Sequence, residues 1–264
     1  MSKADDGFLT EPFDHVREEV RQKYADWRSL LVRVNRLAVD NQYSIEIQLD
    51  SNVERYAAVL FARTLATTQA SILLLEVGLV PQARTLLRSA LETHFALAAI
   101  AKEDRVVDKL IEGHAAEQKR VAKNFGHLQH TELKQIADAE IASDRLQPFL
   151  ASSETALSTL DLAKKAGLEH WYRTVYTDLS WSTHGAAVDL DCHVVVGEDG
   201  NEAEFRNEPE VEDQESSWLC AIEILLKATT ALAAVFPNVD QSPLEQGYAD
   251  LRKLAEKFQT SATL

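Results

Sequence analysis

The sequence predicts an all-α protein, an antiparallel multi-helix bundle with one small β-hairpin late in the chain. Apolar residues recur at intervals of three and four over most of the sequence, which is the period of an amphipathic helix. No apolar strand segments alternate with the helical ones, as they would in an α/β sheet. With 264 residues and 45% hydrophobic content, the chain can bury one sizeable core, so we expect a single helical domain over residues 1–264.

A long N-terminal helix is predicted over residues 12–40. Pro12 stands where helices commonly begin, and apolar side chains from Val16 to Leu37 repeat with a helical period. Residues 41–49 alternate apolar and polar side chains, but one short strand has no neighbour with which to pair. We therefore expect an extended linker there.

The core of the bundle is organised around the unusually apolar segment 79–101. Asp50 or Ser51 caps the helix that precedes it, and Gly78 ends that helix. The connection from Gly78 to Pro81 is so short that the two helices must pack as an antiparallel hairpin. Pro81 is tolerated because the first turn of a helix does not need its missing N–H.

Further helices cover this hairpin, and the core bundle is expected to span about residues 51–186. Their periodicity and turn residues predict them at 105–124, at 131–142, in a short segment closed by Gly167, and at 168–184. Two short strand-like runs around a glycine-containing turn predict a β-hairpin over about residues 191–206. The last helices are predicted within about residues 209–258.

The composition of the chain limits the classes of function that it can have. A formal net charge of −15 argues against broad binding to nucleic acid, because backbone phosphates would be repelled at long range, although it allows a local basic pocket. Cys192 and Cys220 are too few for a disulfide framework, so we expect the cytoplasm. The N-terminus has no apolar targeting segment and the apolar runs are shorter than a bilayer span, so no membrane association is expected.

Two polar stripes are predicted inside this apolar bundle. Arg84, Arg88 and Glu92 follow one another at four-residue steps and share one side of their helix. On the helix at 168–184, five polar residues fall within about a quarter turn of one another by the same 100° arithmetic: His170, Arg173, Thr177, Ser180 and His184. Since buried polar groups need partners, we expect the two stripes to face a common seam. Three arginines and one acid would make that seam positive, which favours an anionic ligand such as a phosphate.

The order of these residues resembles that of a known bacterial family. Arg88 and Glu92 on the central apolar helix are separated by three residues, and Tyr176, Ser180 and His184 follow at the same spacing on a later helix. In these motifs the chain is similar to the family named domain of unknown function 5677, over about residues 60–236. That family has no established activity, so the resemblance supports the fold and nominates these positions without implying a reaction.

A weaker similarity connects the segment from Arg88 to His94 with the helical HEPN ribonucleases, which carry an arginine followed four to six residues later by a histidine. Six positions place Arg88 and His94 about 120° apart on a regular helix, so they would converge only through a distortion or across a dimer. The alternative interpretation is structural: His94 packs beside Phe95, and Arg88 pairs with Glu92 as an ordinary i,i+4 pair.

The leading functional hypothesis is a HEPN-like, metal-independent ribonuclease of a toxin or defence system. Arg88 would orient phosphate, and His184 or His94 would act as general acid or base. The remaining candidate ligand-binding residues are Arg84, Glu92, Arg173, Tyr176 and Ser180. The alternative is a non-enzymatic helical module that binds a ligand or a protein, with the seam structural. An enzyme should place Arg88 and a histidine at one accessible cavity, whereas the alternative predicts a closed network.

Neither a cofactor nor a metal is predicted. The sequence lacks the phosphate-binding, dinucleotide and zinc-protease motifs. His184, Asp189, Asp191, Cys192 and His193 contain metal-ligating side chains, but they run from a helix end into a strand and need not converge. The expected partners are an RNA or nucleotide phosphate, a protein, and a second copy of the chain, because two-fold assemblies are the commonest.

Overall fold

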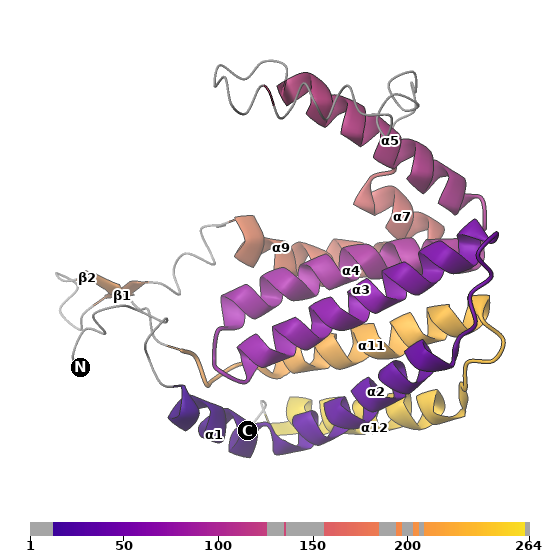
Figure 1. Ribbon diagram of the computed structural model, residues 1–264. Coiled ribbons are helices and arrows are strands. Elements are labelled where there is room, and N and C mark those ends of the chain that lie inside the picture. The colour runs from indigo at the N-terminus through magenta and orange to yellow at the C-terminus, as the bar shows by residue number, and fades with distance from the viewer. Residues whose placement is uncertain are drawn as a thin grey trace.

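Two long helices that lie side by side, α3 (Asn52–Leu75) and α4 (Val80–Lys102), dominate the computed structural model (Figure 1). The Ser51 side chain accepts a hydrogen bond from the Glu54 N–H and so caps α3, as the sequence predicts. Gly78 turns the chain between the helices with φ at 74°, a conformation that suits glycine. The two helices therefore run in opposite directions, which confirms the predicted hairpin.

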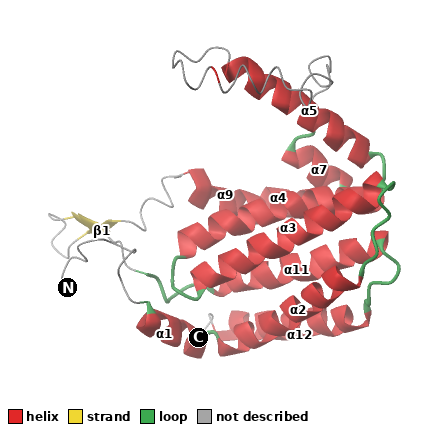
Figure 2. Cartoon of the chain, in the orientation of Figure 1, coloured by secondary structure: helices red, strands yellow, loops and turns green. Residues whose placement is uncertain are grey.

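The structure describes residues 13–125, 135, 156–184, 194–196, 203–205 and 209–261. Within these ranges the prediction of an all-α fold is confirmed, and Figure 2 shows helices in almost every described segment. The predicted helix at 131–142 lies outside the described residues apart from Gln135. The five residues with metal-ligating side chains that are named above, from His184 to His193, lie outside them too, except for the backbone of His184.

Helix α11 (Glu215–Val235) is the second centre of the fold. It packs on α3 and α4 on one side and on α2 (Ala25–Ser44) and α12 (Ser242–Ser261) on the other (Figure 1). The sequence predicts that this helix begins at residue 209, but residues 209–214 are not helical. The Glu210 N–H instead donates to the Gly78 carbonyl at 2.8 Å, which holds the segment against the α3–α4 turn.

The prediction of one N-terminal helix over residues 12–40 is wrong. The chain forms α1 (Asp14–Lys23), breaks at Tyr24, and continues as α2 to Ser44, so only the end of the predicted linker is extended. The Tyr24 hydroxyl donates to the Val211 carbonyl at 3.0 Å and accepts from the Gln214 N–H at 3.1 Å. The ring stacks on Trp218, with centroids 6.0 Å apart. These contacts anchor the break to the start of α11.

The remaining helices lie over the α4 side of the bundle: α5 (Val106–Phe125), α7 (Thr159–Lys165), α8 (Glu169–Trp171), the π-helix η3 (Tyr172–Tyr176) and α9 (Thr177–His184). Strand β1 (Val194–Val196) pairs antiparallel with β2 (Ala203–Phe205), with Val194 opposite Phe205. Both strands lie within the segment for which the sequence predicts a hairpin, while residues 197–202 lie outside the described part.

Helices α3 and α11 are each long and apolar enough, by length and composition alone, to cross a membrane. In α11, 67% of the apolar stretch is buried inside the bundle, as befits a core helix, but in α3 only 39% is buried. The outer side of α3 therefore presents apolar residues that the described bundle does not cover.

Candidate functional site

The predicted stripe of Arg84, Arg88 and Glu92 meets polar side chains where η3 and α9 lie on α4. Of the second predicted stripe only Ser180 takes part, because His170, Arg173 and Thr177 are exposed and the His184 side chain lies outside the described part. We call this cluster the polar seam. It consists of Arg84, Arg88, Glu92, Tyr176, Asp178, Ser180 and Ser182. The prediction that Arg88 and Glu92 contact the helix bearing Ser180 is confirmed.

Arg88 is the centre of the seam. Its Nε donates to Ser180 Oγ at 3.0 Å, one Nη donates to the Tyr176 hydroxyl at 2.6 Å, and the other lies 3.1 Å from a Glu92 carboxylate oxygen. The Tyr176 hydroxyl in turn donates to the same Glu92 oxygen at 2.7 Å. Burial, together with this carboxylate acceptor, raises the pKa of Tyr176 to about 12, so the phenol stays protonated. The result is a closed triangle of an arginine, a tyrosine and a glutamate.

Arg84 makes a second, parallel set of bonds one turn earlier on α4. Its Nε donates to Ser182 Oγ at 3.0 Å, and one Nη donates to an Asp178 carboxylate oxygen at 2.7 Å. Asp178 and Ser182 are not among the site residues that the sequence predicts. Their four-residue spacing on the same predicted helix, matching the step from Arg84 to Arg88, is the signal that would have identified them.

A π-helix sets the side-chain directions in this region. The sequence predicts one regular helix over 168–184, but residues 172–176 form i→i+5 bonds, which insert one extra residue into the turn. The insertion therefore changes the angle between the side chains that precede it and those that follow it by about 100°, compared with a regular helix. As a consequence, Tyr176 reaches Arg88 and stacks on Tyr172, with ring centroids 4.8 Å apart.

The same rotation removes Arg173 from the seam. Its side chain is 67% exposed and bonds to Glu169, one turn back on its own helix, with N–O distances of 2.7 and 3.0 Å. The predicted contribution of Arg173 is therefore wrong, and so is the prediction of a positive seam. Its described charges are two arginines and two carboxylates, those of Asp178 and Glu92.

A comparison with protein families identifies the family of the chain. Residues 54–203 match the "Family of unknown function (DUF5677)". The chain belongs to this family. The match starts a little before residue 60, where the motifs predict the similarity to begin, and ends well before residue 236. It contains the whole seam, whereas α1, α2, α11 and α12 lie outside it. No curated protein and no solved structure matches the chain.

Of the two candidate histidines of this DUF5677 chain, only His94 has a described side chain, and it makes no hydrogen bond with Arg88. His94 is 1% exposed, and neither ring nitrogen has a hydrogen-bond partner among the described residues. Burial, aided by the charge of Lys227, lowers the pKa of His94 from 6.5 to about 3, so the ring is neutral. Its ring lies beside Phe95, as the structural interpretation predicts. His184 is the last residue of α9, and its side chain lies outside the described part.

A small cavity of about 140 Å³ lies at one end of the seam. Arg84, Asp178, Trp171, Cys220 and Glu223 are among its lining residues, whereas Arg88 is not. Burial raises the pKa of the Cys220 thiol to about 12, so a reactive thiolate is not available there.

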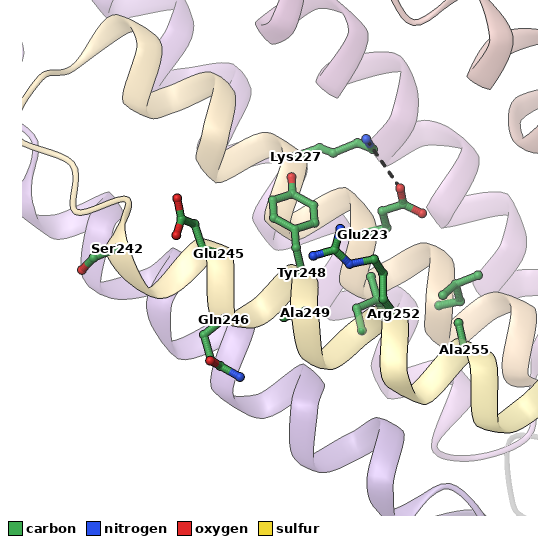
Figure 3. A pocket seen from close by; sticks show the side chains of 11 residues that line it. Glu223, Lys227, Ser242, Glu245, Gln246, Tyr248, Ala249, Arg252 and Ala255 are labelled. Atoms are coloured by element: carbon green, nitrogen blue, oxygen red, sulfur yellow. Dashed lines mark ion pairs between the residues drawn. The ribbon is translucent and has the colours of Figure 1, made fainter.

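A larger groove of about 980 Å³ lies between α11 and α12 (Figure 3). On α11 its lining includes the ion pair of Lys227 and Glu223, 3.5 Å apart, and the Lys227 ammonium stands 4.9 Å over the Trp171 ring. Burial raises the pKa of the Glu223 carboxyl, while Lys227 acts in the opposite direction. On α12 the lining includes Glu245, Tyr248 and Arg252. The groove is not predicted from the sequence, although these three residues recur at helical spacing.

We expect Arg88→Ala to lower the free energy of unfolding by about 2 to 3 kcal/mol. Breaking a buried ion pair typically costs about 3 to 5 kcal/mol, and the half-exposed Glu92 keeps some access to water, which reduces the loss. Arg173→Ala is the matched control, because an exposed i,i+4 pair is worth under about 0.5 kcal/mol. Urea denaturation followed by circular dichroism measures both. Equal effects of the two substitutions would contradict a structural seam.

The stability of the chain should depend on pH through His94. Between about pH 6.5 and 3 the unfolded chain protonates this histidine and the folded chain does not, so the free energy of unfolding falls as the pH decreases below 6.5. We expect a loss of about 1 kcal/mol between pH 7 and 5.5 from this group. His94→Leu should remove that part of the slope in denaturation curves. An unchanged slope would show that the ring is not buried in neutral form.

Proposed function

We propose that this chain is a non-enzymatic binding module, in which the polar seam holds α9 on α4 and the groove between α11 and α12 takes the ligand. The observation that supports this choice is the charge balance of the seam. Arg84 is bonded to Asp178 and Ser182, and Arg88 to Glu92 and two hydroxyls. A network whose charges are already paired needs no anion to complete it.

The burial of His94 and the position of Arg88 also support a binding module over a ribonuclease. The ribonuclease hypothesis needs Arg88 and a histidine at one accessible cavity, but Arg88 lines neither of the two cavities above. His94 lacks exposed nitrogens, and with a pKa of about 3 it would be a poor proton donor or acceptor near neutral pH.

The groove supports a ligand with charges of both signs. Glu245 and Arg252 lie two turns apart on α12, and neither has an ion-pair partner within the described ranges. Seven residues of α-helix separate their backbones by about 10 Å. Tyr248 lies between them beside Arg252 and faces the Glu223–Lys227 pair of α11 (Figure 3). That pair is neutral overall, so the two unpaired charges of α12 determine the preference.

An extended peptide of about three residues matches this spacing. Extended chain spans about 3.3 to 3.6 Å per residue, so the termini of a tripeptide lie about 10 Å apart. Its ammonium would pair with Glu245 and its carboxylate with Arg252, whereas a single amino acid is too short to reach both. The groove lies outside residues 54–203, so this proposal concerns the chain itself and not every DUF5677 member.

Calorimetric titration with trialanine tests the proposal. We expect binding that is lost when the peptide is acetylated and amidated, and that weakens by about fivefold in Glu245→Gln and in Arg252→Gln, as for exposed ion pairs. Lys253→Gln is the control, because Lys253 is exposed on the same helix and does not line the groove. Blocked and free peptides that bind equally, or the absence of binding at millimolar peptide, would contradict the proposal.

A second candidate is metal-independent RNA cleavage at the seam, and the unused donors of Arg88 favour it. One hydrogen each of Nε, Nη1 and Nη2 is engaged by described partners, which leaves two of the roughly five guanidinium N–H groups for a phosphate. In addition, π-turns such as that at Tyr172–Tyr176 frequently occur at functional sites. His184, one turn after Ser180, would then supply the acid or base.

Incubation of the purified protein with single-stranded RNA and EDTA separates the two candidates. From the binding-module proposal we expect intact RNA. Cleavage that Arg88→Lys and His184→Ala abolish, and that Arg173→Ala retains, would establish the ribonuclease instead. Folding of each variant is checked by its circular dichroism melt.

A further inference from the structure

The outer face of α3 is apolar and exposed along four turns of the helix. Val59 is 67% exposed and Leu73 is 66% exposed, which is unusual for large aliphatic side chains of a folded domain. Between them, Ala66 and Ala70 are exposed and Ala62 is half-buried. At 100° per residue all five side chains fall within a strip about 80° wide, so they form one continuous face.

This face has the symmetry of a surface that can bind itself. Val59 and Leu73 lie seven residues before and after Ala66, and Ala62 and Ala70 lie four residues before and after it. If two α3 helices pack antiparallel about a two-fold axis at Ala66, Ala66 meets its own copy. The same operation places Val59 of one chain against Leu73 of the other, a large side chain against a large one at both ends. Alanines at the centre allow the two backbones to approach closely.

The charges near the face are compatible with this pairing. Arg63 is the only ionisable residue from Val59 to Leu73, and it lies at the edge of the strip. In the symmetric pair the two Arg63 positions are about 9 Å apart along the helix axes, close to the Debye length at ordinary salt. Anionic lipid is a less suitable occupant, because a chain with a net charge of −15 is repelled by a negative membrane surface.

We infer that the outer face of α3, centred on Ala66, is the interface of a homodimer in which two α3 helices pack antiparallel. The partner is a second copy of this chain. The inference does not depend on the peptide-binding proposal, because no residue of α3 lines the groove.

Sedimentation analysis of the full chain tests the interface. We expect a dimer, and we expect Ala66→Glu to weaken it by more than tenfold, since two carboxylates would meet at the axis. Ala234→Glu, at an exposed position of α11, is the matched control and should leave the dimer intact. A wild-type chain that stays monomeric at about 0.1 mM, or an effect of Ala234→Glu equal to that of Ala66→Glu, would overturn the inference.

Disulfide cross-linking tests the register, in a Cys192→Ser background. We expect Ala66→Cys to form a covalent dimer on mild oxidation, because identical positions at a two-fold axis come within the Cα separation of about 4.4 to 6.8 Å that a disulfide requires. Ala70→Cys should not link, because its two copies would be about 12 Å apart along the axes. Linking of Ala70→Cys as fast as Ala66→Cys would exclude an axis at Ala66. Binding of the chain to anionic vesicles with loss of the dimer would assign the face to a membrane.

Discussion

An apolar bundle cannot leave a guanidinium without partners, and this constraint determines how the upper half of the molecule is arranged. Helix α4 is buried over most of its length yet carries Arg84 and Arg88 on one side. Glu92 on the same helix pairs with Arg88, and the other hydrogen-bond partners of the two arginines come from elsewhere in the sequence. The π-turn and α9 supply them as hydroxyls and a carboxylate. The position of α9 on α4 follows from this requirement.

The packing of α1, α2, α11 and α12 depends on a different interaction, that of Tyr24 with the start of α11. The Tyr24 hydroxyl joins the break between α1 and α2 to the segment that leads into α11, and its ring lies on Trp218 inside the core. Helix α11 is thereby held between the α3–α4 pair and the α2–α12 pair. Because α12 packs only on α11 and α2 among its principal neighbours, the side of α11 that carries Glu223 and Lys227 stays open as the groove.

Three surfaces of the chain thus differ in their chemistry. The seam is polar and internally paired, the groove has two charges on α12 without an ion-pair partner in the described part of the chain, and the outer face of α3 is apolar, with its residues placed symmetrically about Ala66. A paired network mainly positions helices, unpaired charges select a charged ligand, and an exposed apolar face favours another protein surface. These differences are the reason for assigning the three surfaces separate roles.

Local signals in the sequence determined the α3–α4 hairpin and the ends of its two helices at the turn. The cap at Ser51, the turn at Gly78 and the proline in the first turn of α4 act within a few residues, so they could be predicted without the fold. The pairing of Arg88 with Glu92 and the meeting with Ser180 also followed, because regular helices place residues four apart on one side.

Only the tertiary structure decided where the regular helical pattern of the sequence is interrupted. Tyr24 breaks a helix whose apolar pattern continues through the break, since its partners lie 187 and 190 positions along the chain. The π-turn moves Arg173 into solvent, and Asp178 then balances the seam that the sequence had suggested to be positive. Both features are stabilised by contacts between distant segments, and a periodicity read within one segment carries no information about such contacts.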